Sequence, residues 1–172
     1  MQGKLQQIYR VNHEIGRHGD FEGLIELSAL KRLSSLILAD EESASPSVIQ
    51  VRFEFNLNTL KKAVIKGHIA TTLAVECQRC LDPMSHKVDQ DFELLIDASD
   101  EEVQQFQMDT AYSDEGFLDV FEVIEDELIL SLPLILMHED SSCNTFWVPE
   151  TVDEVDSGKP NPFAVLSTLK EK

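Results

Sequence analysis

Apolar and polar residues alternate most regularly near the middle of the chain. Over Val48–Asn56 every second residue is apolar, so Ile49, Val51, Phe53 and Phe55 would share one face of a β-strand. A period of two is typical of a strand with one buried face. The pattern therefore predicts a strand over this segment, with its apolar face directed into the core.

Two further segments continue the same pattern. Val64–Glu76 is rich in β-branched residues, and Met84–Ile96 places Val88, Phe92 and Leu94 on one face. The intervening Leu57–Lys62 is typical of a hairpin turn. Three neighbouring strands joined by short turns predict an antiparallel meander.

Helical periodicity flanks these strands. After a short extended piece over Asp20–Leu27, Ser28 is a candidate N-cap for a helix with Leu30, Leu33, Ile37 and Leu38 along its apolar stripe. The second helix is predicted to begin at Asp119, with Glu122 three residues later. Its apolar face would hold Val120, Phe121, Ile124 and Leu128, and Pro133 should end it. The apolar Leu134–Met137 should then be extended.

The remaining segments are polar. Asp97–Gly116 is acidic and poorly periodic, which predicts a long mobile loop, with a short helical turn around Val103–Met108. Residues 149–160 are expected to form an acidic flexible linker, and 161–172 a short C-terminal helix capped by Asn161 that docks on the core. The fold class predicted is α+β: one domain over 1–148 with a small antiparallel β-meander, two main helices, the long acidic loop and the C-terminal helix.

Charge is segregated along the chain. The net charge is −18, yet residues 88–158 contain 21 Asp and Glu and no Lys or Arg, whereas residues 1–87 are almost neutral. RNA binding requires local positive potential, so a role in coating RNA is excluded. The acidic half could meet a basic protein, or it could serve only to keep the chain soluble.

The cellular compartment is predicted from segments that the sequence lacks. The sequence has no apolar run long enough to span a membrane and no apolar core of a secretory signal near its start. Three cysteines, an odd number, argue against a disulfide framework. We therefore expect a cytoplasmic protein with no membrane partner.

The cysteines are the first candidate site. Cys77 and Cys80 form a C-x-x-C after a predicted strand, and His138 and Cys143 could complete a tetrahedral zinc site. The 57 residues between Cys80 and His138 make convergence dependent on the fold. Redox chemistry of the pair fits less well, because a strand is predicted after it where a thioredoxin-like pair needs a helix.

Two charged sets are further candidates. Lys61, Lys62 and Lys66 flank the first hairpin turn, while Arg79 and Lys87 flank the cysteine pair. If the meander brings them together they would form an RNA-binding patch; otherwise they are scattered surface charges. The acidic run 125–127 could hold Mg²⁺ in a nuclease, but adjacent helical residues point in different directions, so a solvated helix face is expected. No phosphate-binding glycine loop or hydrolase motif is found, so we predict no enzyme and no small-molecule substrate.

Four of these segments together resemble one bacterial family. They are Glu76–Cys80 (ECQRC), Val123–Pro133 (VIEDELILSLP), His138–Cys143 (HEDSSC) and Lys159–Lys170 (KPNPFAVLSTLK), in this order along the chain. They are similar to the large ribosomal RNA subunit accumulation protein family, YceD. The broader family often has a second cysteine pair after the Leu-Pro segment, and here His138 stands where its first cysteine would fall.

The resemblance implies a function in the synthesis, processing or stability of 23S rRNA, with no known catalytic activity. The partner it implies is 23S rRNA or a pre-50S particle. The alternative is that the chain acts as an acidic, chaperone-like binder of a basic large-subunit ribosomal protein.

Overall fold

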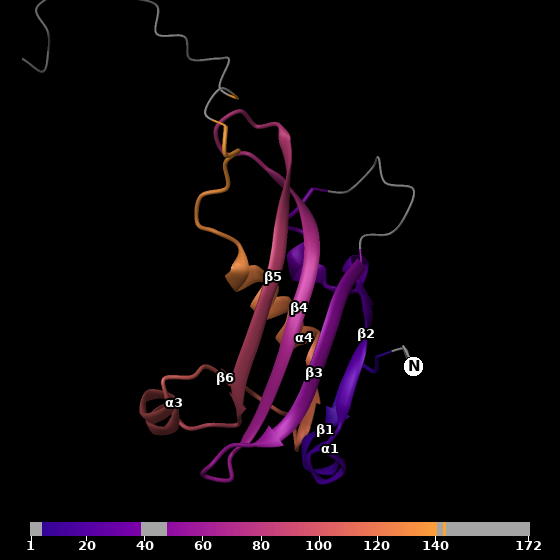
Figure 1. Cartoon of the computed structure of the whole chain (residues 1–172), viewed down its shortest axis with the longest axis vertical. Helices are drawn as coiled ribbons and strands as arrows, with labels where there is room; N and C mark the ends of the chain where they lie inside the picture. The colour runs from indigo at the N-terminus through magenta and orange to yellow at the C-terminus, as the bar shows by residue number, and fades with distance from the viewer. Residues whose placement is uncertain (1–4, 39–47, 141–142, 144–172) are drawn as a thin grey trace, which may run out of the picture.

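The computed structural model describes residues 5–38, 48–140 and 143. Five strands form one sheet in the order β2-β3-β4-β5-β6, and β1 pairs with β7 in a second, two-stranded sheet (Figure 1). In chain order the elements are β1 Ile8–Arg10, α1 Val11–Arg17, β2 Asp20–Glu26, the 3₁₀ turn η1 Leu27–Ala29, α2 Lys31–Ser34, β3 Val48–Leu57, β4 Ala63–Glu76, β5 Pro83–Ile96, α3 Asp100–Phe106, β6 Thr110–Ala111, β7 Phe117–Asp119 and α4 Val120–Ser131.

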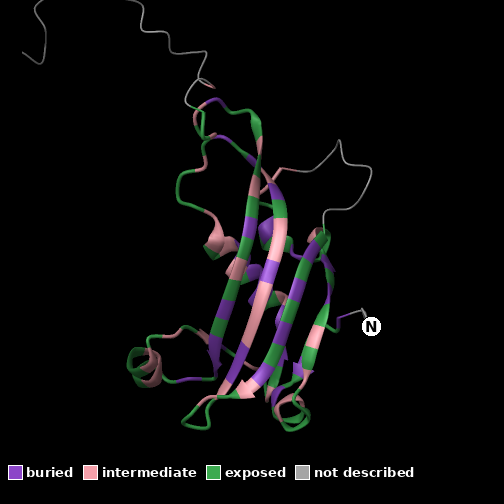
Figure 2. Cartoon of the chain, viewed as in Figure 1, coloured by how far each residue is buried: buried purple, intermediate pink, exposed green. Residues whose placement is uncertain are grey.

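The predicted antiparallel meander is confirmed. β3 pairs with β4, and β4 with β5, through registers that place Phe53 opposite Gly67 and Gly67 opposite Phe92. The alternation in β3 buries Ile49, Val51 and Phe55 as expected, and the colours of Figure 2 alternate along the same strand. β2 adds a fourth antiparallel strand at the β3 edge, whereas β6 joins β5 in parallel over only two residues.

One face of the sheet carries the main core. In Figure 1, α4 lies across this face behind β3, β4 and β5. The helix contributes Val120, Ile124 and Leu128, all fully buried. Tyr9 adds an aromatic contact from β1, because its ring lies edge-on to Phe53 at 5.4 Å between centroids. Burial of this face is what fixes the strand register, since a slip by one residue would expose it.

On the opposite face, the described residues form a second buried cluster at one end of the sheet. It consists of Val64, Leu95 and Ala98, with Val103 and Phe106 of α3 packed against it. Most of the other side chains on this face are polar, although Leu24 and Val48 are also exposed there. The face holds the ion pairs Arg52–Asp20 at 3.0 Å and Lys66–Glu93 at 2.8 Å.

The helix predicted from Ser28 is wrong in extent. Residues 27–29 form a 3₁₀ turn, α2 covers only Lys31–Ser34, and Ser28 caps neither. Leu30, at the N-cap of α2, has φ −99° and ψ 89°, which interrupts a continuous helix. The chain then turns to the sheet, where the Leu38 N–H donates to the Ala74 carbonyl. Only α4, which begins after Asp119 and ends before Pro133, matches a predicted main helix.

The acidic stretch after β5 is more ordered than its composition indicated. Ser99 and Glu102 form a complete capping box that begins α3, and β6 follows the helix. This capping box starts the helix at Asp100, whereas the sequence pattern predicts a helical turn only around Val103–Met108. The expected linker 149–160 and C-terminal helix 161–172 lie outside the described residues. Among the residues described, no helix has the length and apolar character to cross a membrane.

Candidate metal centre

The Cys-x-x-Cys segment forms the tip of the long β4–β5 hairpin. The Leu81 N–H donates to the Cys77 carbonyl at 2.8 Å, and the Cys77 N–H donates to the Asp82 carbonyl at 3.0 Å. Leu81 adopts a left-handed conformation with φ 64°, which closes the turn. Cys77 and Cys80 are both buried. The hairpin therefore holds two thiols side by side in a compact knuckle.

The segment after α4 brings the other two candidate ligands to this knuckle. Leu134–Met137 is not part of a strand, but the Leu136 carbonyl accepts the Gln78 N–H at 2.8 Å. Two residues later, Nδ1 of His138 lies 3.4 Å from Sγ of Cys80. The ligand atoms of Cys77, Cys80, His138 and Cys143 all lie within 4.8 Å of one another. The structure thus brings together all four residues that the sequence singled out for metal.

Arg79 ties the two segments together. Its Nε donates to Sγ of Cys143 at 3.0 Å, and its guanidinium also donates to the carbonyls of His138 at 2.9 Å and Asp140 at 2.6 Å. Arg79 is also a predicted RNA contact, yet its side chain here donates hydrogen bonds to His138, Asp140 and Cys143. This residue therefore positions the ligand set.

The electrostatics of the knuckle favour a thiolate at Cys77. Burial opposes that charge and raises the pKa of the thiol, but backbone N–H donors outweigh burial. The N–H groups of Cys80, His138 and Arg79 lower the pKa of Cys77 to about 5. At Cys80 a backbone hydrogen bond from Asp82 lowers the pKa, but burial and the neighbouring thiols Cys77 and Cys143 raise it to about 11. The knuckle thus favours a thiolate at Cys77 and a protonated thiol at Cys80.

The donor set fits zinc. Three thiols and one imidazole are a common ligand combination for a structural zinc ion, with Zn–S bonds of about 2.3 Å. Tetrahedral bonds of that length place two sulfur ligands about 3.8 Å apart. The observed separations, up to 4.8 Å, are close to that spacing. A cation would also relieve the mutual repulsion of several thiolates, which burial makes costly.

The predicted basic residues do not form one patch. Lys61, Lys62 and Lys66 lie at or next to the β3–β4 turn, and Arg79 lies at the β4–β5 turn, at the other end of β4. A strand of 14 residues spans about 45 Å, so the two groups are far apart (Figure 1). Three of the lysines are also paired: Lys62 with Glu102, Lys66 with Glu93 and Lys87 with Asp89.

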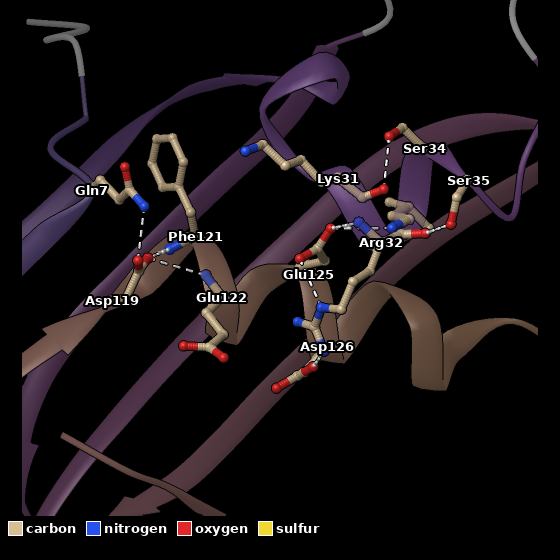
Figure 3. A network of polar contacts seen from close by, with 11 residues as sticks. Gln7, Lys31, Arg32, Ser34, Ser35, Asp119, Phe121, Glu122, Glu125 and Asp126 are labelled. Carbon is tan, nitrogen blue, oxygen red and sulfur yellow. Dashed lines mark hydrogen bonds and ion pairs between the residues drawn. The ribbon is translucent and has the colours of Figure 1, made fainter. Parts of the chain in front are cut away.

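Glu125 is the residue that the sequence reasoning missed. It was expected on a solvated helix face, but it is 8% exposed and faces α2. Figure 3 shows its carboxylate beside Arg32, which lies between Glu125 and Asp126. Its spacing of four residues from Phe121 and three from Leu128 places it beside the apolar face of α4, but the charge of a Glu in an acidic run is typical of a solvated position. Glu125 therefore belongs to the internal structure and is unavailable for a metal.

Comparison with known proteins identifies the family. Residues 65–170 match the model of the family described as large ribosomal RNA subunit accumulation protein YceD. A protein of that name from Haemophilus influenzae is 30% identical over 162 residues, which cover 91% of this chain and 90% of the relative. No solved structure matches. The matched region includes the knuckle, α4 and the His138–Cys143 segment, and the chain belongs to the YceD family.

Proposed function

We propose that this chain is a non-enzymatic factor that supports the synthesis, processing or stability of 23S rRNA during assembly of the 50S subunit in the cytoplasm. The name of the Haemophilus influenzae relative and the description of the matched family support the process. The distribution of charge over the fold supports a binding role. The proposed mode of action depends on this charge distribution.

The ligand that the geometry favours is a basic large-subunit ribosomal protein. β5 from Val88 onward, α3 and α4 carry many carboxylates and no Lys or Arg. On the open sheet face, Arg52 and Lys66 are paired with carboxylates, which cancels their attraction for phosphate. An acidic surface steers a basic partner to it and suppresses association with nucleic acid. By binding such a protein, the chain would act on 23S rRNA indirectly.

Direct contact with 23S rRNA or a pre-50S particle is the second candidate. Lys61 supports it, because this exposed residue in the β3–β4 turn has no ion-pair partner among the residues the structure describes. Its neighbour Lys62 is paired with Glu102. Of the five basic residues predicted to contact RNA, Lys61 alone is unpaired within the described part of the chain, and one lysine supports at most a weak phosphate contact, whereas assembly on RNA usually needs several.

Affinity purification of the full chain from cells, with and without RNase, separates the two candidates. If the proposal is right, basic large-subunit proteins stay bound after RNase and are released as salt concentration rises. Loss of these proteins on RNase treatment, together with loss on Lys61→Glu, would instead support the RNA candidate. Recovery of no ribosomal component would overturn both. Lys87→Glu, at a lysine that is already paired, is the matched control for Lys61→Glu.

We further propose that Cys77, Cys80, His138 and Cys143 hold a structural zinc ion. The ion would link the hairpin tip to the segment that follows α4, two parts of the chain separated by about sixty residues. Such a link constrains the unfolded chain and orients the residues around it. The close approach of the four ligand atoms supports this role.

Elemental analysis of the purified chain tests the zinc proposal. One equivalent of zinc is expected, with loss in Cys80→Ser and His138→Ala. His13→Ala is the matched control, because His13 is exposed, lies outside the ligand set and hydrogen-bonds to its neighbour Glu14. A chain that is metal-free as purified, and that takes up no zinc when reduced and supplied with it, would refute the site.

A further inference from the structure

A groove of about 340 Å³ runs between α4 and the end of the main sheet. Its apolar lining comes from three elements: Leu94 of β5, Ala111 of β6, and Val123 and Ile129 of α4. The four residues of the metal centre contribute nothing to the lining of this groove. It is therefore a separate feature of the molecule.

Carboxylates form the walls of this groove. Glu122, Asp126 and Glu127 project from α4, and Asp109 faces them from the segment before β6. Among the described residues that line the groove, Arg32 is the basic one, and it is already engaged by Glu125 and Asp126. The groove therefore combines an apolar floor with an excess of negative charge.

Glu127 is the residue of the groove that most clearly favours a cationic partner. It is half-buried, and its carboxylate has no hydrogen-bond or ion-pair partner within the described part of the chain. Burial raises the pKa of this carboxyl, and the charges of Asp109 and Asp126 raise it further. A partly desolvated carboxylate among like charges is unfavourable until a cation meets it.

Exposed apolar side chains complete the surface. Leu130 is 74% exposed and Tyr112 is 72% exposed, and both line the groove. Large apolar side chains at this exposure, next to a groove, are typical of a protein-binding surface. Tyr is also one of the residue types that are enriched at protein interfaces.

Building on the proposed function, we infer that this groove binds a segment of a basic ribosomal protein in which Lys or Arg alternates with apolar residues. The basic side chains would meet Glu122 and Glu127, and the apolar ones would cover Leu130 and Tyr112. Charge complementarity argues against a nucleic acid at this place. The lining is partly acidic and partly apolar, so it favours a peptide that alternates basic with apolar residues over a purely basic one. The apolar part of the groove offers no charge for a basic side chain to pair with.

Peptide titration of the full chain tests the inference. The probes are two synthetic ten-residue peptides, one alternating Lys with Leu and one alternating Lys with Ser. The first should bind at least fivefold more tightly, and Leu130→Ser should remove most of that difference. Glu122→Gln/Glu127→Gln should weaken binding of the Lys-Leu peptide about tenfold, since each lost charge contact in an interface commonly costs several-fold in affinity.

The matched control is Glu101→Gln/Glu115→Gln, which removes the same charge from exposed positions outside the groove. It should change the affinity less than twofold. Equal losses in the two double variants would show that only net charge matters, and would overturn the inference. Binding of neither peptide would overturn it as well.

Two other occupants are outcomes of the same experiment. Nuclear Overhauser contacts between Tyr112 and Phe163 in the free chain would assign the groove to the chain's own C-terminal segment. Dependence of the Tyr112 and Leu130 signals on protein concentration would assign it to a second copy. Either result would overturn the inference.

Repeating the RNase-treated purification with Glu122→Gln/Glu127→Gln separates this inference from the proposed function. Unchanged recovery of basic ribosomal proteins by the variant would refute the groove and leave the proposed function standing. Failure of the wild-type chain to recover any would refute the proposed function, while the peptide titration would still decide what the groove binds.

Discussion

Glu125 of α4 supplies the N-terminal cap that α2 does not have. Its Oε1 accepts the backbone N–H of Arg32 at 2.6 Å, although the two residues are 93 positions apart in the sequence. The same oxygen accepts the Leu33 N–H at 3.0 Å, and Oε2 accepts from Nε of Arg32 (Figure 3). The N-cap residue of α2 itself, Leu30, offers no side-chain acceptor.

Glu125→Ala should therefore destabilise the fold by about 3 kcal/mol, because two backbone N–H groups and a guanidinium lose their acceptor. Glu122→Ala, on the exposed side of the same helix, should cost less than about 0.5 kcal/mol. Chemical denaturation monitored by circular dichroism measures both. A Glu125→Ala variant as stable as Glu122→Ala would show that the contact does not stabilise α2.

The same contact should make stability fall in acid. Burial raises the pKa of Glu125, but hydrogen bonds from the Leu33 N–H and from Arg32 outweigh burial, so the pKa lies below the ordinary value of 4.5. As the pH falls, the Glu125 carboxylate is therefore protonated in the unfolded chain at a higher pH than in the folded chain. The stabilisation is fully present above pH 4.5 and is lost as the pH falls through the lower pKa of the folded state.

Denaturation midpoints measured from pH 7 down to pH 3 should accordingly show a shallower fall for Glu125→Gln than for the wild type. Glu127 should behave in the opposite way, since burial and the charges of Asp109 and Asp126 raise its pKa. Its charged form is unfavourable in the folded chain at neutral pH, so Glu127→Gln should stabilise the protein there. Parallel curves for the wild type and Glu125→Gln would contradict the assignment.

Gly67 should tolerate no side chain. A Cβ placed there would lie 2.4 Å from Cε1 of Phe92 and 2.5 Å from the carbonyl oxygen of Arg52. Because the clash involves backbone as well as a ring that packs over the glycine, Gly67→Ala should cost about 2 kcal/mol. Thermal unfolding of the purified variant tests this.

The control for that variant is Gly16→Ala in α1, where a Cβ would meet nothing within 4 Å. Alanine is favoured over glycine inside a helix by about 1 kcal/mol, so this variant should be slightly more stable than the wild type. A Gly67→Ala variant that unfolded at the wild-type temperature would show that β3, β4 and β5 do not pack closely around Gly67.

Arg79 should determine zinc affinity without being a ligand. Arg79→Ala removes the donors to Cys143, His138 and Asp140. Loss of such supporting contacts typically weakens metal binding about 10–100-fold. Competition with a chromophoric chelator measures the affinity, and Lys87→Ala is the control, because Lys87 pairs with Asp89 on the sheet. Equal zinc affinity in Arg79→Ala and wild type would show that the ligands need no such support.

Local periodicity and local caps predict the three strands of the meander, β3, β4 and β5, and the main helix α4, whereas the short elements β1, α1, β6 and β7 emerge only in the structure. The alternation over Val48–Asn56 specified β3 and its buried face, and Asp119 and Pro133 specified the limits of α4. The resemblance in short motifs also identified the family correctly.

The way in which distant residues meet depends instead on how the elements pack together. The long β4–β5 hairpin brought Cys77 and Cys80 to His138 and Cys143, and its length kept Arg79 away from Lys61. Glu125 is buried because α4 packs its polar side chain against the start of α2, a contact that no local pattern encodes. Periodicity reports which face of an element is apolar, but convergence and burial of charge depend on packing between elements that are far apart in the chain.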